Sequence, residues 1–126
     1  MTIELQVAIG QYSDAGPRPL NQDFHGAAVP SGAALRCKGI ALALADGIGS
    51  SEVSHIASAA AVRGFLDDYY ATSQAWTVRR AAQRVIAATN SWLHAQTLQG
   101  PGRHDRDHGH VCTFSALVFK GREAHL

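Results

Sequence analysis

The sequence is short of cysteine and has no long apolar run, and each shortage excludes a class of protein. Its 126 residues include only two cysteines, Cys37 and Cys112, too few for the disulfide framework of a small secreted domain. No apolar stretch reaches the length of a membrane-spanning helix, and the first ten residues lack the pattern of a signal peptide. We therefore expect reduced thiols, a cytoplasmic location and no membrane contact.

Charge is also sparse. Charged residues make up 17% of the chain and the formal net charge is +1, so the basic surplus of most nucleic-acid-binding proteins is missing. Hydrophobic residues make up 46%, which is enough for a packed core and argues against disorder. The length is that of one ordinary domain.

Hydrophobic patterning predicts an α+β fold. Alternation of apolar and polar residues indicates strands, and apolar residues spaced by three and four indicate helices. Strands on both sides of a helix pair favour α+β over a regular alternation of strands and helices. The expected elements are strands at 3–10, 24–29, 39–45 and 111–119, helices at 51–72 and 75–99, and a further strand after a turn at Lys120-Gly121.

The two expected helices carry further predictions. Ser50 or Ser51 is the expected N-cap of the first helix. Trp76 and Trp92 are expected to anchor packing around the second helix rather than to bind a ligand. We expect the stretch before residue 39 to be a connection and residues 103–110 a polar loop. The stripe expected on the inner face of the second helix is Val78, Ala82, Val85, Ile86, Thr89 and Leu93.

The stretch ALADGIGSSE places Asp46 at the end of an apolar strand, beside Gly47 and Gly49. A buried bare carboxylate is costly, so this side chain must be solvated, hydrogen-bonded or bound to a cation. An aspartate with a neighbouring glycine carbonyl suits a hard divalent cation. Short Asp-Gly turns are common, however, so the stretch taken alone favours a turn cap.

The stretch GPRPLNQD offers a second polar cluster. Arg18 has a planar guanidinium that suits phosphate, and two prolines stiffen the loop around it. Asn21, Gln22 and Asp23 offer oxygens for a metal ion or its waters. In isolation the cluster is a polar loop with a surface arginine.

Two other kinds of site are weaker. Residues 104–110 hold candidate zinc ligands at compatible spacings: His104, Asp105, Asp107, His108 and His110. No helix or hairpin frames them, so a solvated loop is favoured. Cys37 lies between Arg36 and Lys38, and no histidine is near it in sequence to activate it. The chain has neither a G-x-S-x-G motif nor a phosphate-binding P-loop.

Four separated sequence blocks are more informative together than singly, because they occur in a particular order. R-x-x-N-Q-D at 18–23 is followed by A-D-G-x-G at 45–49, two amphipathic helices, and the strand CTFSALV. This ordered set resembles the metal-dependent protein phosphatase family (protein phosphatase 2C-like) of bacterial type, over residues 7–126. The stretches SSEVSHIAS and TNSWLHAQT resemble members fused to a Ser/Thr kinase domain.

The resemblance implies a fold and an activity. The fold is a four-layer α-β-β-α sandwich of antiparallel sheets with a helix pair, of which residues 1–126 are the N-terminal part, ending before the family's G-D-S-R strand. Half of such a domain leaves strand edges open, so self-association is expected. The activity is hydrolysis of phosphoserine or phosphothreonine in a protein substrate, by a water that bridges two Mn²⁺ or Mg²⁺ ions.

The resemblance also assigns roles to residues. Asp46 would bridge the two metal ions, Gly47 would bind one through its carbonyl, and Asp23 would act through a metal-bound water. Arg18 would hold the phosphate. The supporting residues would be Asn21, Gln22, Gly49 and Thr113.

This sequence departs from the family pattern at several points. Gln22 stands where many relatives have glutamate, Ser50 replaces a glycine, and Ile48 replaces a histidine found in animal members. Of the family's G-T-T block only Thr113 matches. Asp46 is the one direct carboxylate ligand of the family set within these residues, so we expect weak metal binding and little activity from this chain alone. The alternative is a non-catalytic, phosphatase-like binding or regulatory module.

Overall fold

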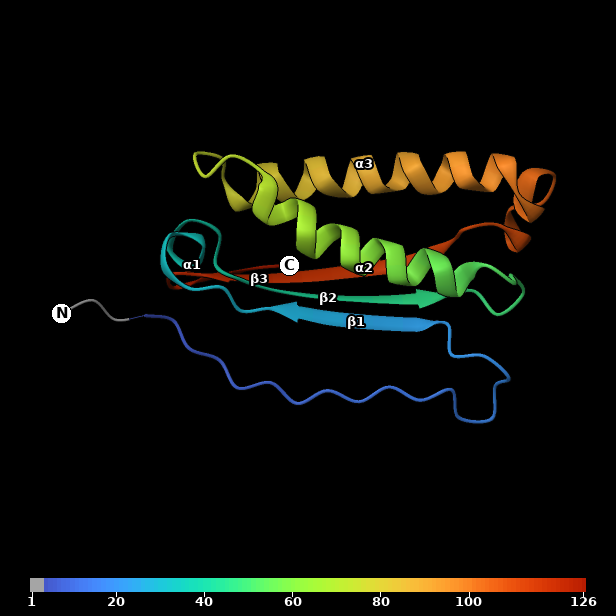
Figure 1. Cartoon of the computed structure of the whole chain (residues 1–126), viewed down its shortest axis with the longest axis horizontal. Coiled ribbons are helices and arrows are strands. Elements are labelled where there is room, and N and C mark those ends of the chain that lie inside the picture. Colours follow the sequence, from blue (N-terminus) through green and yellow to red (C-terminus); the bar gives the residue numbers. More distant parts are fainter. Residues whose placement is uncertain (1–3) are drawn as a thin grey trace.

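One antiparallel sheet lies beneath two long helices in the computed structural model, which describes residues 4–126 (Figure 1). The strand order is β1-β2-β3-β4, so each strand pairs with its neighbours in chain order. The fold is therefore α+β, as predicted. The elements are β1 (Asp23–Ala28), α1 (Gly32–Lys38), β2 (Ile40–Gly47), α2 (Ser54–Ala71), α3 (Val78–Gln99), the short 3-10 helices η1 (Pro101–Arg103) and η2 (Arg106–His108), β3 (Cys112–Lys120) and β4 (Glu123–His125).

The second sheet of the expected sandwich is not found among residues 4–126. Residues 4–10 form no strand, and residue 3 lies outside the described residues. This segment runs on the side of the sheet opposite α2 and α3 (Figure 1), with Val7 and Ile9 each 39% exposed. The predicted first strand is wrong for these residues because alternation alone does not make a strand. A strand also needs a neighbour for its backbone hydrogen bonds.

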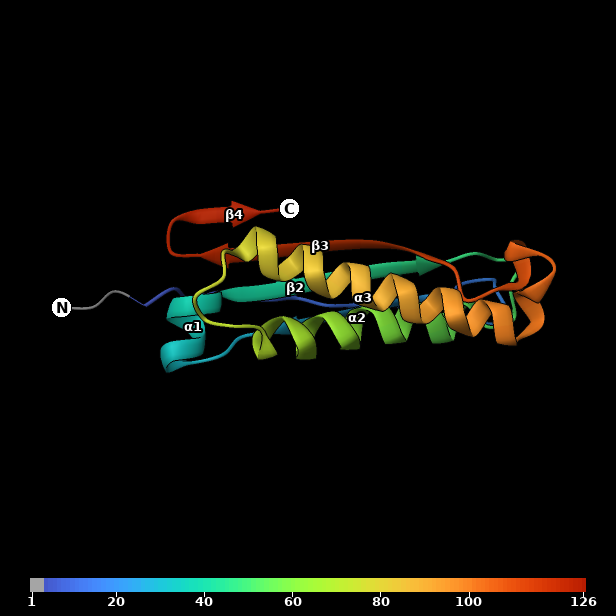
Figure 2. The same cartoon turned by 90° about the horizontal axis from the view of Figure 1, so that it is seen from above.

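Small residues let α2 pack closely on the sheet. Ala41, Ala43 and Ala45 are alternate residues of β2, and each is at most 4% exposed beneath the helix. Phe65 of α2 stacks on Tyr69 with ring centroids 5.5 Å apart. The core therefore lies between α2 and the central strands, while α3 runs beside α2 in the view from above (Figure 2).

Both long helices are confirmed, but they begin later than predicted. The N-cap of α2 is Val53, which makes no side-chain cap hydrogen bond. Ser51 instead accepts a hydrogen bond from the Val53 amide at 3.2 Å, just outside the helix. Thr77 caps α3 by accepting a hydrogen bond from the Arg80 amide at 3.1 Å.

Several smaller expectations are wrong. Trp92 is 48% exposed and Ile86 is 41% exposed, because α2 covers only a narrow stripe of α3. Trp76 does pack against the core, as expected. The connection before β2 contains the short helix α1, and the polar loop contains η1 and η2. The buried residues of α3 are Val78, Ala81, Val85, Leu93 and Thr97.

Within residues 4–126, no helix combines the length and the hydrophobicity needed to cross a membrane. The two long helices are amphipathic or alanine-rich, and they pack on the sheet or on each other.

Two tyrosines join the end of α2 to the turn between α1 and β2. The Tyr69 hydroxyl donates to the carbonyl of Lys38 at 2.6 Å, and the Tyr70 hydroxyl donates to the carbonyl of Gly39 at 2.8 Å. Burial raises the pKa of each tyrosine to about 12. Burial also lowers the pKa of Lys38, whose ammonium donates to Thr72 and Ser73.

The tyrosine pKa values predict loss of stability in alkali. A raised folded-state pKa contributes stability that is fully present below pH 10.0 and is lost as the pH rises through about 12. The lowered pKa of Lys38 has the opposite effect on stability, but this effect no longer changes once the pH is above 10.5. We therefore expect the urea concentration at half unfolding to decrease as the pH is raised from 10.5 to 12. Tyr69→Phe should flatten this dependence, and an equally steep fall in the variant would contradict it.

Candidate functional site

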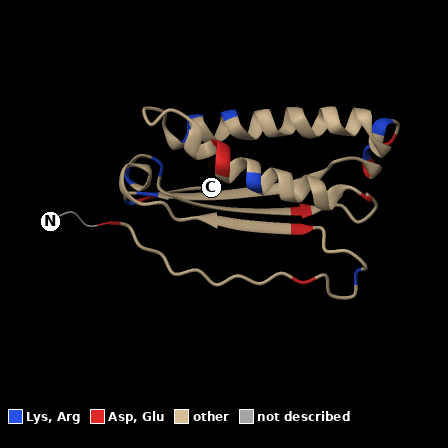
Figure 3. Ribbon diagram, viewed as in Figure 1, with Lys and Arg blue, Asp and Glu red and all other residues tan. Residues whose placement is uncertain are grey.

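Strand pairing brings two carboxylates together at one end of the sheet. β1 begins at Asp23 and β2 reaches Asp46, and these two residues are direct partners in the antiparallel register. Side chains of directly opposite residues point to the same face, with Cβ atoms about 5 Å apart. Ala45 is buried under α2, so Asp46 points to the helix-free face. Figure 3 shows the two acidic strand ends side by side.

The Asp46 carboxyl group changes the ionisation of Asp23. The pKa of Asp23 is raised, first by a hydrogen bond with the Asp46 carboxyl, then by slight burial and by the negative charge of Asp46. The nearby Arg18 guanidinium lowers it and only partly offsets these effects. Two like charges held together in this way favour a proton or a cation between them.

Arg18 reaches the same end of the sheet from the preceding loop. A Cβ atom on Gly49 would lie only 2.8 Å from the Arg18 Nη1, so the glycine leaves space for the guanidinium. Together the two loops and the strand ends enclose an open, mainly polar pocket of about 300 Å³. Its lining residues are Asp14, Ala15, Arg18, Leu20, Asn21, Gln22, Asp23, Asp46, Gly47 and Gly49.

The amide side chains of the loop serve the protein itself. The Asn21 Oδ1 accepts a hydrogen bond from the Asp23 amide at 3.0 Å, and its Nδ2 donates to Ser13 at 2.8 Å. The Gln22 Nε2 donates to the Ser51 carbonyl at 2.7 Å. Both side chains therefore hold the loop in place, as supporting residues would.

Gly47 and Thr113 fix the end of β2. The Gly47 amide donates to the Gln22 carbonyl at 3.0 Å. A Cβ atom on Gly47 would lie 2.8 Å from the Ser54 Cβ and 3.0 Å from the Gln22 carbonyl oxygen, so three segments meet here only because this residue is glycine. Thr113 is the β3 partner of Asp46 and accepts a hydrogen bond from its amide at 3.2 Å.

The histidine-rich segment does not join this pocket. No three His, Cys, Asp or Glu side chains among residues 4–126 lie close enough to hold one metal ion. His108 lies 3.8 Å from Asp105 as an exposed pair. Cys37 and Cys112 are both free thiols.

Two residues near the pocket were missed from the sequence. Asp14 lines the pocket, and its carboxylate accepts a hydrogen bond from Tyr12 at 3.2 Å. The sequence did hold one indication of its role, because Asp14 lies in the same loop as Arg18, four residues earlier. Ser51 was expected to cap a helix, and nothing local showed that its carbonyl would meet Gln22.

Comparison of this chain with family models, with curated proteins and with solved structures gives no match. The chemistry of the pocket must therefore be inferred from its residues. Two facing carboxylates and a backbone carbonyl suit a hard divalent cation, and a guanidinium beside them suits a phosphate group.

Proposed function

We propose that this chain forms part of a metal-dependent protein serine/threonine phosphatase domain of the 2C-like kind. One observation supports the proposal above all. Arg18, Asp23 and Asp46 come from separate sequence blocks, and they line the same pocket at one end of the sheet. The order of the blocks and the spatial convergence of their polar side chains are independent properties, so chance similarity of sequence would not produce both.

The residues present fit the implied metal. Asp46 and the Gly47 carbonyl would hold Mn²⁺ or Mg²⁺, Asp23 would contact it through water, and Arg18 would orient the phosphate. When bound, a pair of divalent ions would supply an activated water and neutralise charge on the phosphoryl group. The protein's own contribution is to hold the carboxylates opposite each other and to present the guanidinium through the gap beside Gly49.

The same donor set predicts weak binding. Two carboxylates cannot neutralise two divalent ions, and no third ligand of the histidine, cysteine or carboxylate type joins them within residues 4–126. A complete centre would need further carboxylates. We therefore expect Mn²⁺ to bind this chain with a dissociation constant of roughly millimolar order, and we expect little hydrolysis of p-nitrophenyl phosphate.

The test measures Mn²⁺ binding and also shows where the ion binds. Mn²⁺ should broaden the amide NMR signals of Asp23, Asp46 and Gly47 first, and phosphoserine added with Mn²⁺ should shift the backbone amide signals of residue 18 and of Gly49, which lies against the guanidinium. Arg18→Lys, which keeps the charge but loses the planar fork, should abolish these shifts. Broadening centred on residues 104–110 would contradict the proposal. Micromolar Mn²⁺ affinity in calorimetry, or robust turnover, would contradict the expected weakness.

A second function is a phosphatase-like module that binds a partner without catalysis. The contact between Gln22 and Ser51 favours it, because this side chain is used within the protein and adds no negative charge to the pocket. Binding of a phosphoserine peptide that depends on Arg18 but is unchanged by removal of divalent ions would support this function over hydrolysis.

The proposed setting and partners follow from the same function. Free Cys37 and Cys112 fit a cytoplasmic setting, and the substrate would be a phosphorylated serine or threonine protein. A fused kinase domain and self-association through strand edges are also proposed. Leu44 lies on the inner strand β2 and is 55% exposed on the helix-free face of the sheet, so a contact through this face is a further route to self-association.

A further inference from the structure

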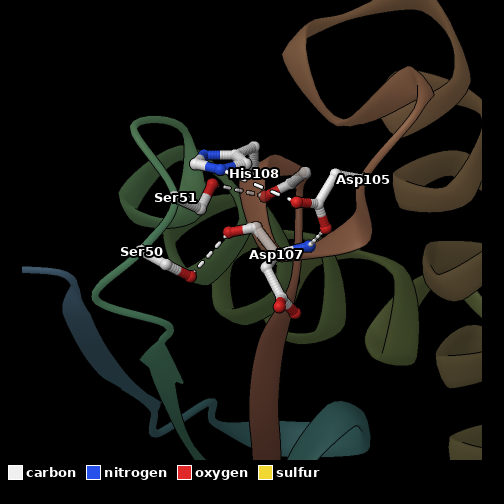
Figure 4. A network of polar contacts seen from close by, with 6 residues as sticks. Ser50, Ser51, Asp105, Asp107 and His108 are labelled. Atoms are coloured by element: carbon white, nitrogen blue, oxygen red, sulfur yellow. Dashed lines mark hydrogen bonds and ion pairs between the residues drawn. The ribbon is translucent and has the colours of Figure 1, made fainter.

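Three serines tie the histidine-rich segment to the loop that follows Asp46. Ser50 donates to the Asp107 carbonyl at 2.7 Å, and Ser51 donates to the Gly109 carbonyl at 2.6 Å (Figure 4). Ser54, the first residue of α2, donates to the Val111 carbonyl at 2.8 Å. We call these three serines the serine latch. Their acceptors are alternate carbonyls of residues 107–111, so the latch holds this backbone along its length.

Most of the latch is buried. Ser51 is 2% exposed and Ser54 is 0% exposed. Loss of a buried hydroxyl partner leaves a polar group without a hydrogen bond, which destabilises the fold. The contact between the latch and residues 107–111 is therefore a fixed part of the fold, unlike that of a solvated loop.

Gln22 connects this latch to the carboxylate pair. Its side-chain Nε2 donates to the Ser51 carbonyl at 2.7 Å, while its own carbonyl accepts from the Gly47 amide at 3.0 Å. It lies directly before Asp23, and Gly47 lies directly after Asp46. One residue thus contacts both strand ends that carry the carboxylates and the serine that holds Gly109.

We propose that Gln22 is a positioning residue that couples the Asp23–Asp46 pair to residues 105–111 through Ser51. Its amide fixes how far the serine latch lies from the ends of β1 and β2. A change in the position of the two carboxylates therefore changes how firmly residues 105–111 are held. Release of that segment in turn changes the position of the carboxylates. The consequence for metal binding rests on the proposed function, whereas the mechanical link does not.

Glutamate at this position would break the link. A carboxylate at neutral pH has no hydrogen to donate, so it would face the Ser51 carbonyl with two acceptors opposed. The same change adds a negative charge near Asp23 and Asp46, which by itself would strengthen cation binding. The positioning role and a purely electrostatic role thus predict opposite effects of Gln22→Glu.

The test compares Gln22→Glu and Gln22→Met with the matched control Gln83→Glu on the exposed side of α3. Metal-free hydrogen exchange is measured at the amides of Gly109 and His110, which are bonded to Arg106 and Thr97. Both Gln22 variants should speed this exchange about three- to tenfold, the equilibrium effect of one hydrogen bond, and the control should not. Both should also weaken Mn²⁺ broadening at Asp46 by a similar factor.

The outcomes separate this proposal from the proposed function. Unchanged exchange at Gly109 in both Gln22 variants would overturn the link. Tighter Mn²⁺ binding by Gln22→Glu would overturn the expected effect of the link on the carboxylate pair, because the added charge would then be the dominant influence on binding. A lower melting temperature with unchanged exchange and unchanged Mn²⁺ binding would show a merely structural role and would also overturn it. If the unaltered protein binds no Mn²⁺ at Asp46, the phosphatase proposal fails, and the metal-free exchange still decides whether Gln22 couples the two parts.

Discussion

Gly39→Ala is expected to lower the free energy of unfolding by more than about 3 kcal/mol, a large share of the about 5–15 kcal/mol that is usual for a domain. Gly39 connects α1 to β2 with a φ of +84°. With ψ at −164°, this conformation is almost restricted to glycine and costs another residue about 1–3 kcal/mol. The added Cβ would also lie 2.1 Å from the Phe119 carbonyl oxygen, a backbone atom. Phe119 pairs with Ile40, so relief of this overlap would open the junction of β2 and β3.

Gly32→Ala is the matched control for this prediction. Gly32 has a φ of +61°, but a Cβ there would meet nothing within 4 Å. The control therefore also places a side chain at a positive φ but removes the steric overlap, and it should lose only about 1–2 kcal/mol. Urea unfolding followed by circular dichroism measures both variants. Equal losses would show that the contact with Phe119 relaxes easily.

Asp46→Asn is expected to remove the Mn²⁺-induced broadening at the ends of β1 and β2. The substitution keeps the size of the side chain and the pairing with Asp23 and Thr113, but it removes the charge that would bind the cation directly. Asp67→Asn, at an exposed position on α2, is the control and should leave the broadening unchanged. Equal broadening of Asp46→Asn and the unaltered protein would place the metal elsewhere.

The same pair predicts how binding depends on pH. The pKa of Asp23 is raised above its ordinary value of 3.8, chiefly by the hydrogen bond with Asp46. A proton on the pair competes with the cation, so Mn²⁺ binding should weaken as the pH falls through this raised pKa, before an isolated aspartate would be protonated. An NMR titration at several pH values measures this. Binding that stays constant down to pH 4 would contradict it.

The local pattern of apolar and polar residues was sufficient to predict the central strand and the two long helices. The apolar run before Asp46 forms β2, and the three-and-four spacing forms α2 and α3. It failed for residues 4–10, where alternation is present but no strand pairs with the segment. It failed also for Trp92, because the burial of a helix face depends on what packs against it.

The candidate site, like the fold, was only partly predictable from the sequence. Residue type and position made Arg18, Asp23 and Asp46 candidates, but only the order of the sequence blocks and the family resemblance assigned them roles in one site. The sequence only led us to expect that these residues lie close together. Whether Asp23 and Asp46 meet depends on the register of β1 with β2, because residues 23 positions apart come together only when the strands pair.

Sequence pattern alone was enough to identify the central strand, the two long helices and the side chains that are chemically able to bind a cation or a phosphate. Tertiary structure alone decided that the Gln22 amide meets Ser51 and that Ser51 holds Gly109, 58 positions away. The physical reason is that a hydrogen bond between distant segments depends on the packing of α2, β2 and the segment after α3 at once. No local pattern encodes such a meeting point.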